Sequence, residues 1–151
     1  MKDPIDSKLI IALQENAQTT AQELAERLGL SSSQAARRRQ RLEASGVILG
    51  YRAQLDAAAL GLGVQAFVQV QLLNHDPALS KSFNKLIGAQ PEIISAWAMT
   101  GDADLLLRIY SKDLASLNTL IHDILLAHGA VSRVHSQIVM NQIKQDAPLP
   151  T

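Results

Sequence analysis

Four arginines in five positions, Arg37 to Arg41, follow the segment Ser31-Ser32-Ser33-Gln34. In the Ser-x-x-Gln spacing each side chain can satisfy a backbone group at the first turn of a helix, so a helix is predicted to start near Ser32. Gly46 can adopt the left-handed conformation with which many helices end. The chain is therefore constrained to carry a capped, strongly basic helix close to its N-terminus.

Two further helices are predicted before this one. Thr20 and Glu23 form a second capping box, and Gly29 ends the helix that it opens. Asp6 is the expected cap of a first helix. Three short helices joined by tight turns indicate a helix-turn-helix bundle, in which the basic helix would be the DNA reader.

The charge pattern supports DNA binding only locally, because the whole chain has 14 basic and 14 acidic residues. Residues 31–52 contain five arginines and a single acid, Glu43. Residues 56–151 contain six basic and eight acidic residues, and a basic helix on such a mildly acidic body can approach phosphate in one orientation and not in others. The alternative is a solvated helix face that is merely rich in arginine.

Composition and the absence of known motifs argue against several other classes of protein. Cysteine is absent, so disulfides and thiolate metal sites are excluded. No apolar stretch reaches the roughly 18 residues of a membrane span, and we expect a cytoplasmic protein without a membrane partner. The four histidines show no metal-ligand spacing, and no catalytic motif is present, so we expect no metal, no cofactor and no enzyme activity. Those histidines are His75, His122, His128 and His135.

A second domain is predicted after an alanine- and glycine-rich linker at residues 57–63, which follows an expected strand at Gly50–Leu55. Alternating apolar residues from Val64 to Leu72 predict a strand with one buried face. The order of the later segments is helix, strand, strand, helix, strand. Asp76 is expected to cap the first of these helices and Ser111 the second. The strands are expected at residues 93–100, 105–110 and 131–140.

This βαββαβ order indicates a ferredoxin-like fold, with helices on one face of an antiparallel sheet. The other face carries residues such as Trp97 and Met99 or their neighbours, and an uncovered apolar sheet face usually finds a partner. We therefore expect a homodimer, which would also present two basic helices about one DNA turn apart, roughly 34 Å. The predicted domains are residues 1–49, a strand and linker at 50–63, and residues 64–151.

The chain resembles the Lrp/AsnC family of transcriptional regulators along nearly its whole length. The resemblance rests on Gly29-Leu30-Ser31, Arg41-Leu42-Glu43-x-x-Gly46-Val47-Ile48, Gly50-Tyr51 and the loop Gly101-Asp102-Ala103-Asp104, in this order. It implies an α+β protein with an N-terminal winged helix-turn-helix domain and a C-terminal ferredoxin-like (RAM-type) domain. It also implies dimers that commonly assemble into octamers, and a small effector, often an amino acid, bound between subunits.

Carried onto this sequence, the resemblance assigns effector binding to Thr100, Gly101, Asp102 and Asp104, and more weakly to Ser136. A glycine turn exposes backbone donors for a carboxylate, and an aspartate can receive an ammonium group. The alternative is that Gly101 and Asp102 only form the turn and that Asp104 pairs locally.

For DNA contact the candidates are Ser32, Ser33, Gln34, Arg37, Arg38 and Arg41. The residues nearest the helix N-terminus enter the major groove deepest, so Ser33, Gln34 and Arg37 are expected to read bases. Arg38 and Arg41 are better placed for phosphate, although Arg38 could equally brace the bundle. The rival function is a dimeric small-molecule sensor whose helix-turn-helix contacts proteins.

Two residues depart from the family pattern. Arg39 replaces an aliphatic residue on the inner side of the basic helix. Because a buried unpaired guanidinium is costly, its stem should lie along the core and its head should reach water, an acid or phosphate. Ala103 stands where the family often has an aromatic residue, which would open or reshape the effector pocket.

Overall fold

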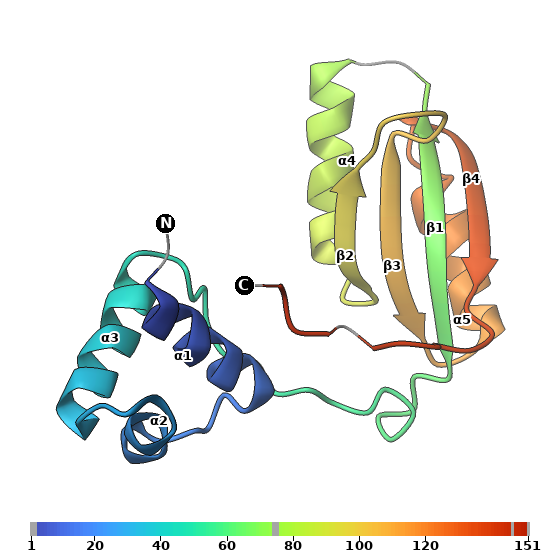
Figure 1. Cartoon of the computed structure of the whole chain (residues 1–151). Coiled ribbons are helices and arrows are strands. Elements are labelled where there is room, and N and C mark those ends of the chain that lie inside the picture. Colours follow the sequence, from blue (N-terminus) through green and yellow to red (C-terminus); the bar gives the residue numbers. More distant parts are fainter. Residues whose placement is uncertain (1–2, 74–75, 146, 151) are drawn as a thin grey trace. The chain divides into compact units, whose positions relative to one another are not determined.

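The structure, a computed structural model, describes residues 3–73, 76–145 and 147–150 (Figure 1). His75, expected not to bind a metal, lies outside these ranges. The chain divides into two compact units. One unit contains the chain up to Gln54 together with the C-terminal residues from Ile143, and the other is Leu55–Gln142.

The N-terminal unit contains three helices, and the cap signals explain two of their starts. Both expected capping boxes are present, Thr20 with Glu23 and Ser31 with Gln34. The predicted cap of the first helix was wrong: Asp3 is the cap and accepts from the amide of Ile5, whereas Asp6 is buried within the first turn of the helix. The helices are α1 (Pro4–Glu15), α2 (Ala21–Leu28) and α3 (Ser32–Ala44).

The core of this unit is aliphatic and joins all three helices. Leu9 of α1 and Leu24 of α2 are fully buried, and Ala35 and Leu42 are the buried residues of α3. Gly29, with φ of 68°, provides the tight turn between α2 and α3. This packing holds one side of α3 against the bundle and leaves the opposite side exposed.

The C-terminal unit is a four-stranded antiparallel sheet with the strand order β2-β3-β1-β4. Its elements are β1 (Val64–Leu72), α4 (Pro77–Ala89), β2 (Ile93–Ala98), β3 (Leu105–Ser111), α5 (Leu114–Thr119), a π-helical turn (Leu120–Leu125) and β4 (Val131–Ile138). The predicted ferredoxin-like βαββαβ order is confirmed.

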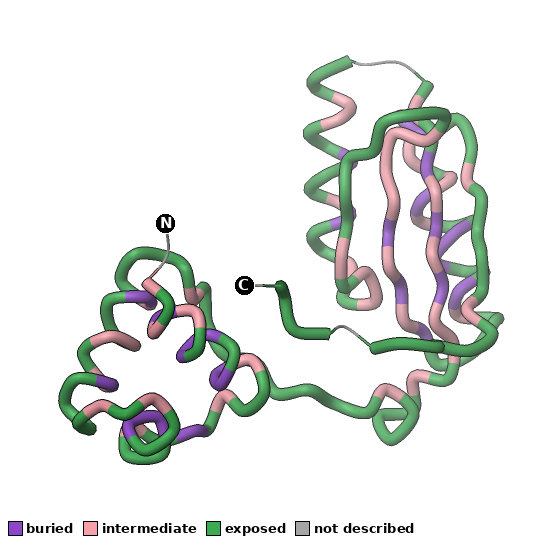
Figure 2. Tube along the Cα trace, viewed as in Figure 1, coloured by how far each residue is buried: buried purple, intermediate pink, exposed green. Residues whose placement is uncertain are grey.

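One face of the sheet packs against the helices. Ala66, Val68 and Val70 of β1 are completely buried and alternate with partly or fully exposed neighbours, as Figure 2 shows along that strand. They contact Phe83 of α4 and Leu125 of the π-helical turn in one cluster. The opposite face carries Trp97 and Leu106, and none of the described helices of this unit covers it (Figure 1).

Two expectations about element bounds were wrong. Residues 50–55 form no strand, because no strand among the described residues pairs with them and an extended segment needs such a neighbour. Ser111 is the buried last residue of β3, whereas Asp113 caps α5 by accepting from the amide of Ser116 at 2.7 Å. In the described part of the chain no helix combines the length and apolarity needed to cross a membrane.

Candidate functional site

The exposed side of α3 is formed by residues that repeat at helical spacing. Ser33, Arg37 and Gln40 lie on the side opposite the buried Ala35 and Leu42. Sequence reasoning missed Gln40, although its spacing of three residues after Arg37 would have placed it on this side. An exposed glutamine can form two hydrogen bonds with an adenine edge, so this side offers both a cation and an amide to DNA.

The capping box restricts what Gln34 can offer. Its Oε1 accepts from the Ser31 amide at 3.0 Å, and the Ser31 Oγ accepts in return from the Gln34 amide at 3.2 Å. The side-chain NH2 of Gln34 has no partner among the residues that the structure describes. Gln34 is therefore preorganised as a donor, suited to acceptor groups such as guanine O6 and N7 or phosphate oxygens. Ser32 is exposed at the first position of the helix.

The four arginines have different environments, and Arg37 is the unpaired one. It is exposed, and within the described residues it has neither an ion pair nor a side-chain hydrogen bond. Its guanidinium can thus form the bidentate contact with guanine without first breaking a protein contact.

Arg38 is held by two carboxylates of α1. Its Nη1 donates to Asp3 at 2.5 Å and to Asp6 at 2.8 Å, and its side chain is 24% exposed. The hydrogen bond from Arg38 lowers the pKa of Asp3, and the bonds to Asp3 and then Asp6 raise the pKa of Arg38. These contacts support the alternative role of Arg38, bracing the bundle.

Arg41 also pairs with Asp6 but is far more accessible. Its Nη2 donates to Asp6 Oδ2 at 2.5 Å, while the arginine side chain remains 60% exposed. Arg41 stands four residues after Arg37, on a neighbouring part of the same exposed side. It can reach a phosphate if it leaves Asp6.

Arg39 behaves as expected for an arginine on the inner side of the helix. Its Nε donates to Glu43 at 3.0 Å and its Nη1 donates to the Thr19 carbonyl at 3.3 Å. The expectation that its head reaches an acid is confirmed. Tyr51 completes the cluster by donating its hydroxyl to Glu43 at 2.7 Å.

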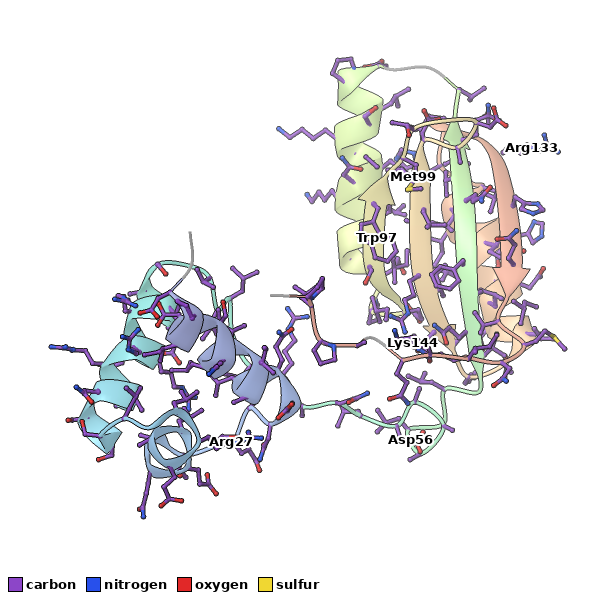
Figure 3. All side chains as sticks on the ribbon, in the orientation of Figure 1. Arg27, Asp56, Trp97, Met99, Arg133 and Lys144 are labelled. Atoms are coloured by element: carbon purple, nitrogen blue, oxygen red, sulfur yellow. The ribbon has the colours of Figure 1, made fainter. Side chains whose placement is uncertain are left out.

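A second candidate site lies on the open face of the sheet, beside the β2–β3 loop. Two shallow hollows of about 240 and 230 Å³ share Gln69, Asp102 and Ala103 as lining residues. Gln71, Arg133 and His135 complete the first hollow, and Met99, Thr100 and Leu106 complete the second. Figure 3 shows Trp97 on β2, Met99 just beyond its end and Arg133 on β4.

Only some of the expected effector residues meet at these hollows. Asp102 lines both and Thr100 lines one, while Gly101 forms the turn beside them with φ of 108°. Asp104 instead accepts from the Leu72 amide of β1 at 2.7 Å, a bond to a distant segment rather than the local cap or pair given as its alternative. Ser136 pairs in register with Val68 and therefore lies on the opposite face from His135, whose partner is Gln69.

Sequence reasoning missed the strand residues of the hollows, above all Arg133 and His135. The signal was present in β1, where Gln69 and Gln71 alternate with buried valines and so mark the open face. The same signal was weak in β4, where too few residues are buried to show which side chains face the core.

His128, a described histidine outside the hollows, does not stand in a catalytic arrangement. His128 lies 3.1 Å from the Ser82 hydroxyl, but its Nδ1 accepts from the Ala130 amide at 3.2 Å. The proton of the neutral ring is therefore on Nε2 and points to Ser82, so His128 cannot act as the base for that hydroxyl. Across residues 3–73, 76–145 and 147–150 no group of three His, Asp or Glu side chains could hold a metal ion.

Comparison with known proteins identifies the family to which each part of the chain is similar. The model of the Lrp/AsnC ligand binding domain matches residues 65–149, and that of a winged helix-turn-helix DNA-binding domain matches residues 2–48. The chain belongs to the Lrp/AsnC family of transcriptional regulators. The predicted family and α+β fold class, with a winged helix-turn-helix and a ferredoxin-like domain, are thus confirmed.

Relatives match this Lrp/AsnC regulator over almost their whole lengths. A leucine-responsive regulatory protein of Rhizobium meliloti is 37% identical over 94% of this chain and 91% of its own. The transcriptional activator DecR of Escherichia coli is 32% identical over 99% of both chains. A Neisseria meningitidis transcriptional regulator crystallised with L-Met is 34% identical, with a TM-score of 0.95 over 99% of this chain and 97% of that one.

Proposed function

We propose that this Lrp/AsnC regulator binds double-stranded DNA as a homodimer and that an amino acid bound at the sheet modulates it. Ser33, Gln34, Arg37 and Gln40 would read bases from α3 in the major groove. Ser32 and Arg41 would contact phosphates, and Arg38 would hold α3 against α1. The observation that supports DNA binding most is Arg37, which is exposed in the middle of the exposed side of α3 and has no side-chain partner among the described residues.

The dimer is supported by the open face of the sheet. Trp97 is 44% exposed there and Met99 46%, although both are large apolar side chains. Leu106 and Phe67 extend this apolar area across the neighbouring strands. A second copy of the same face would cover it, and a two-fold axis would pair two α3 helices for one DNA site.

The ligand part is supported by the charges at the hollows. Asp102 can receive an ammonium group and Arg133 can bind a carboxylate, while Met99 and Leu106 offer apolar surface to a side chain. Together these groups match a free amino acid. The Neisseria relative, which was crystallised with L-Met, supports this ligand class.

Selection from a random duplex library tests the DNA proposal without knowledge of the operator. The wild-type protein should enrich a motif with two half-sites about 10 base pairs apart, centre to centre, and its affinity should fall steeply with salt. The Arg37→Ala variant should enrich a more degenerate motif. A protein that enriches no motif and shows no salt dependence would instead be the protein-contacting sensor.

A further inference from the structure

Asp6 is a buried acid that touches the DNA-reading helix from another element. It lies in the first turn of α1 and is only 7% exposed. Its two carboxylate oxygens serve different arginines of α3: Oδ1 accepts from Arg38 and Oδ2 from Arg41. One carboxylate thus holds two of the positive charges that α3 could offer to DNA.

The two arginines are not held equally. Arg38 has a second carboxylate, Asp3, and a mostly covered side chain. For Arg41, Asp6 is the one carboxylate partner among the described residues, and most of its side chain faces solvent. Arg41 can therefore exchange its partner at low cost, whereas Arg38 cannot.

We propose that Asp6 is an internal competitor of the DNA backbone for Arg41, an inference that rests on the proposed DNA binding. In the free protein Arg41 lies on Asp6, and in the complex it moves to a phosphate while Arg38 stays with Asp3 and Asp6. Each binding event then has to replace one ion pair by another. Asp6 weakens DNA binding by this competition although it contributes to the fold.

The charge geometry accounts for the direction of the effect. Most of the Arg41 side chain is in solvent and Asp6 keeps Arg38 as a partner, so a phosphate can displace Arg41 from Asp6. The ion pair still opposes DNA binding by the amount that it contributes. Phosphates are the same in every sequence, so the competition should be independent of the bases.

The test measures the affinity of the full chain for a random-sequence duplex at several salt concentrations. Asp6→Asn should tighten binding about two- to fivefold, the size expected from one ion pair whose arginine is mostly exposed, and the gain should shrink as salt rises. Asp3→Asn is the matched control: it removes a carboxylate from the same network without touching Arg41, and it should change the affinity by less than the Asp6 variant does.

A double-mutant cycle separates competition from bracing. In an Arg41→Gln background, Asp6→Asn should bring no gain, because the charge that it releases is absent. A merely structural Asp6 would give weaker binding in both backgrounds, and that result would overturn the proposal. An equal gain in DNA affinity with and without Arg41 would also overturn the proposal.

A measurement on the unmutated protein covers the case in which the Asp6 variant does not fold. Addition of the random duplex should shift the carboxyl ¹³C resonance of Asp6 and leave that of Asp3 nearly unchanged. An unmoved Asp6 resonance in the DNA-bound protein overturns the proposal. Wild-type protein that does not bind the duplex even at low salt would instead contradict the proposed function itself.

Discussion

The guanidinium of Arg39 lies 4.7 Å from the centroid of the Tyr51 ring while its Nε donates to Glu43. Tyr51 follows α3 by several residues, so this contact fastens the segment after the helix to the helix itself. The side chain of Arg39 is 28% exposed, so most of its long stem is covered. The arginine therefore provides both packing and a polar anchor for the chain after α3.

Replacing Arg39 by Ala should lower the free energy of unfolding by about 1–2 kcal/mol, because the ring contact, the packing of the stem and two hydrogen bonds are lost together. Chemical denaturation measures this. Tyr51→Phe keeps the ring under the guanidinium and should cost less. Equal stability of the Arg39→Ala variant and the wild type would show that the cluster contributes nothing.

Acid should weaken the same cluster. The hydrogen bonds from Tyr51 and then from Arg39 lower the pKa of Glu43 below its ordinary value of 4.5. The unfolded chain then binds this proton more readily than the folded one, so the contribution of Glu43 is complete above pH 4.5 and is lost as the pH falls through the folded pKa. Denaturation of Glu43→Gln at a series of pH values should lack this part of the acid-induced loss. If the difference in unfolding free energy between wild type and variant does not change with pH, Glu43 makes no pH-dependent contribution to stability.

Arg37→Ala should weaken binding to a selected DNA site by about 1–3 kcal/mol and relax the preference at one base pair. Arg41→Ala should weaken binding to selected and random duplexes alike, because it removes a phosphate contact. Arg27→Ala is the control for loss of a positive charge, since Arg27 lies on α2 and pairs with Glu15. Equal losses on both duplexes for Arg37→Ala would remove its assigned role as a base reader.

Among the twenty amino acids, at least one should stabilise the protein in a thermal-shift screen. At a concentration of 100 times its Kd the ligand should add about 2.7 kcal/mol of stability. Asp102→Asn and Arg133→Gln should each reduce this gain, whereas Asp123→Asn, on the exposed side of the π-helical turn, should not. If the two site variants respond as the wild type does, the ligand binds elsewhere.

Trp97→Asp should prevent self-association, because it places a charge in the apolar face that a second copy would cover. Sedimentation or light scattering would then give the mass of one chain for the variant and that of a dimer or octamer for the wild type. Leu114→Asp, at an exposed residue of α5, is the control for a charge at a different surface. A wild-type protein with the mass of one chain would contradict the proposed dimer.

The helix starts that were predicted correctly are those with a local cause. The boxes at Thr20 and Ser31 lie within one turn, so the sequence contains both partners of each bond. The two wrong caps, Asp6 and Ser111, each have another aspartate nearby in the sequence that makes the cap instead. Asp6 instead pairs with Arg38 and Arg41, which belong to a helix about thirty residues later in the chain. A local sequence pattern cannot predict ion pairs between such distant residues.

The candidate ligand site was predicted only in its loop. Asp102 and Thr100 belong to one short segment. Arg133 and His135 reach the hollow that Asp102 lines through the register of β4 against β1. Register depends on pairing between distant segments, so alternation within β4 alone could not place Ser136 on the correct face. Likewise, residues 50–55 would form a strand only beside a pairing strand, and the local sequence does not show whether one is present.

The position of β1 in the middle of the sheet has a consequence for how a ligand would act. Gln69 and Gln71 line a hollow while Val68 and Val70, on the same strand, form part of the buried core. Local opening cannot release the glutamines without breaking the ladders on both sides of β1, so the hollow and the core should unfold as one cooperative unit. Occupancy of the hollow would then raise the hydrogen-exchange protection of the whole sheet rather than of the loop alone.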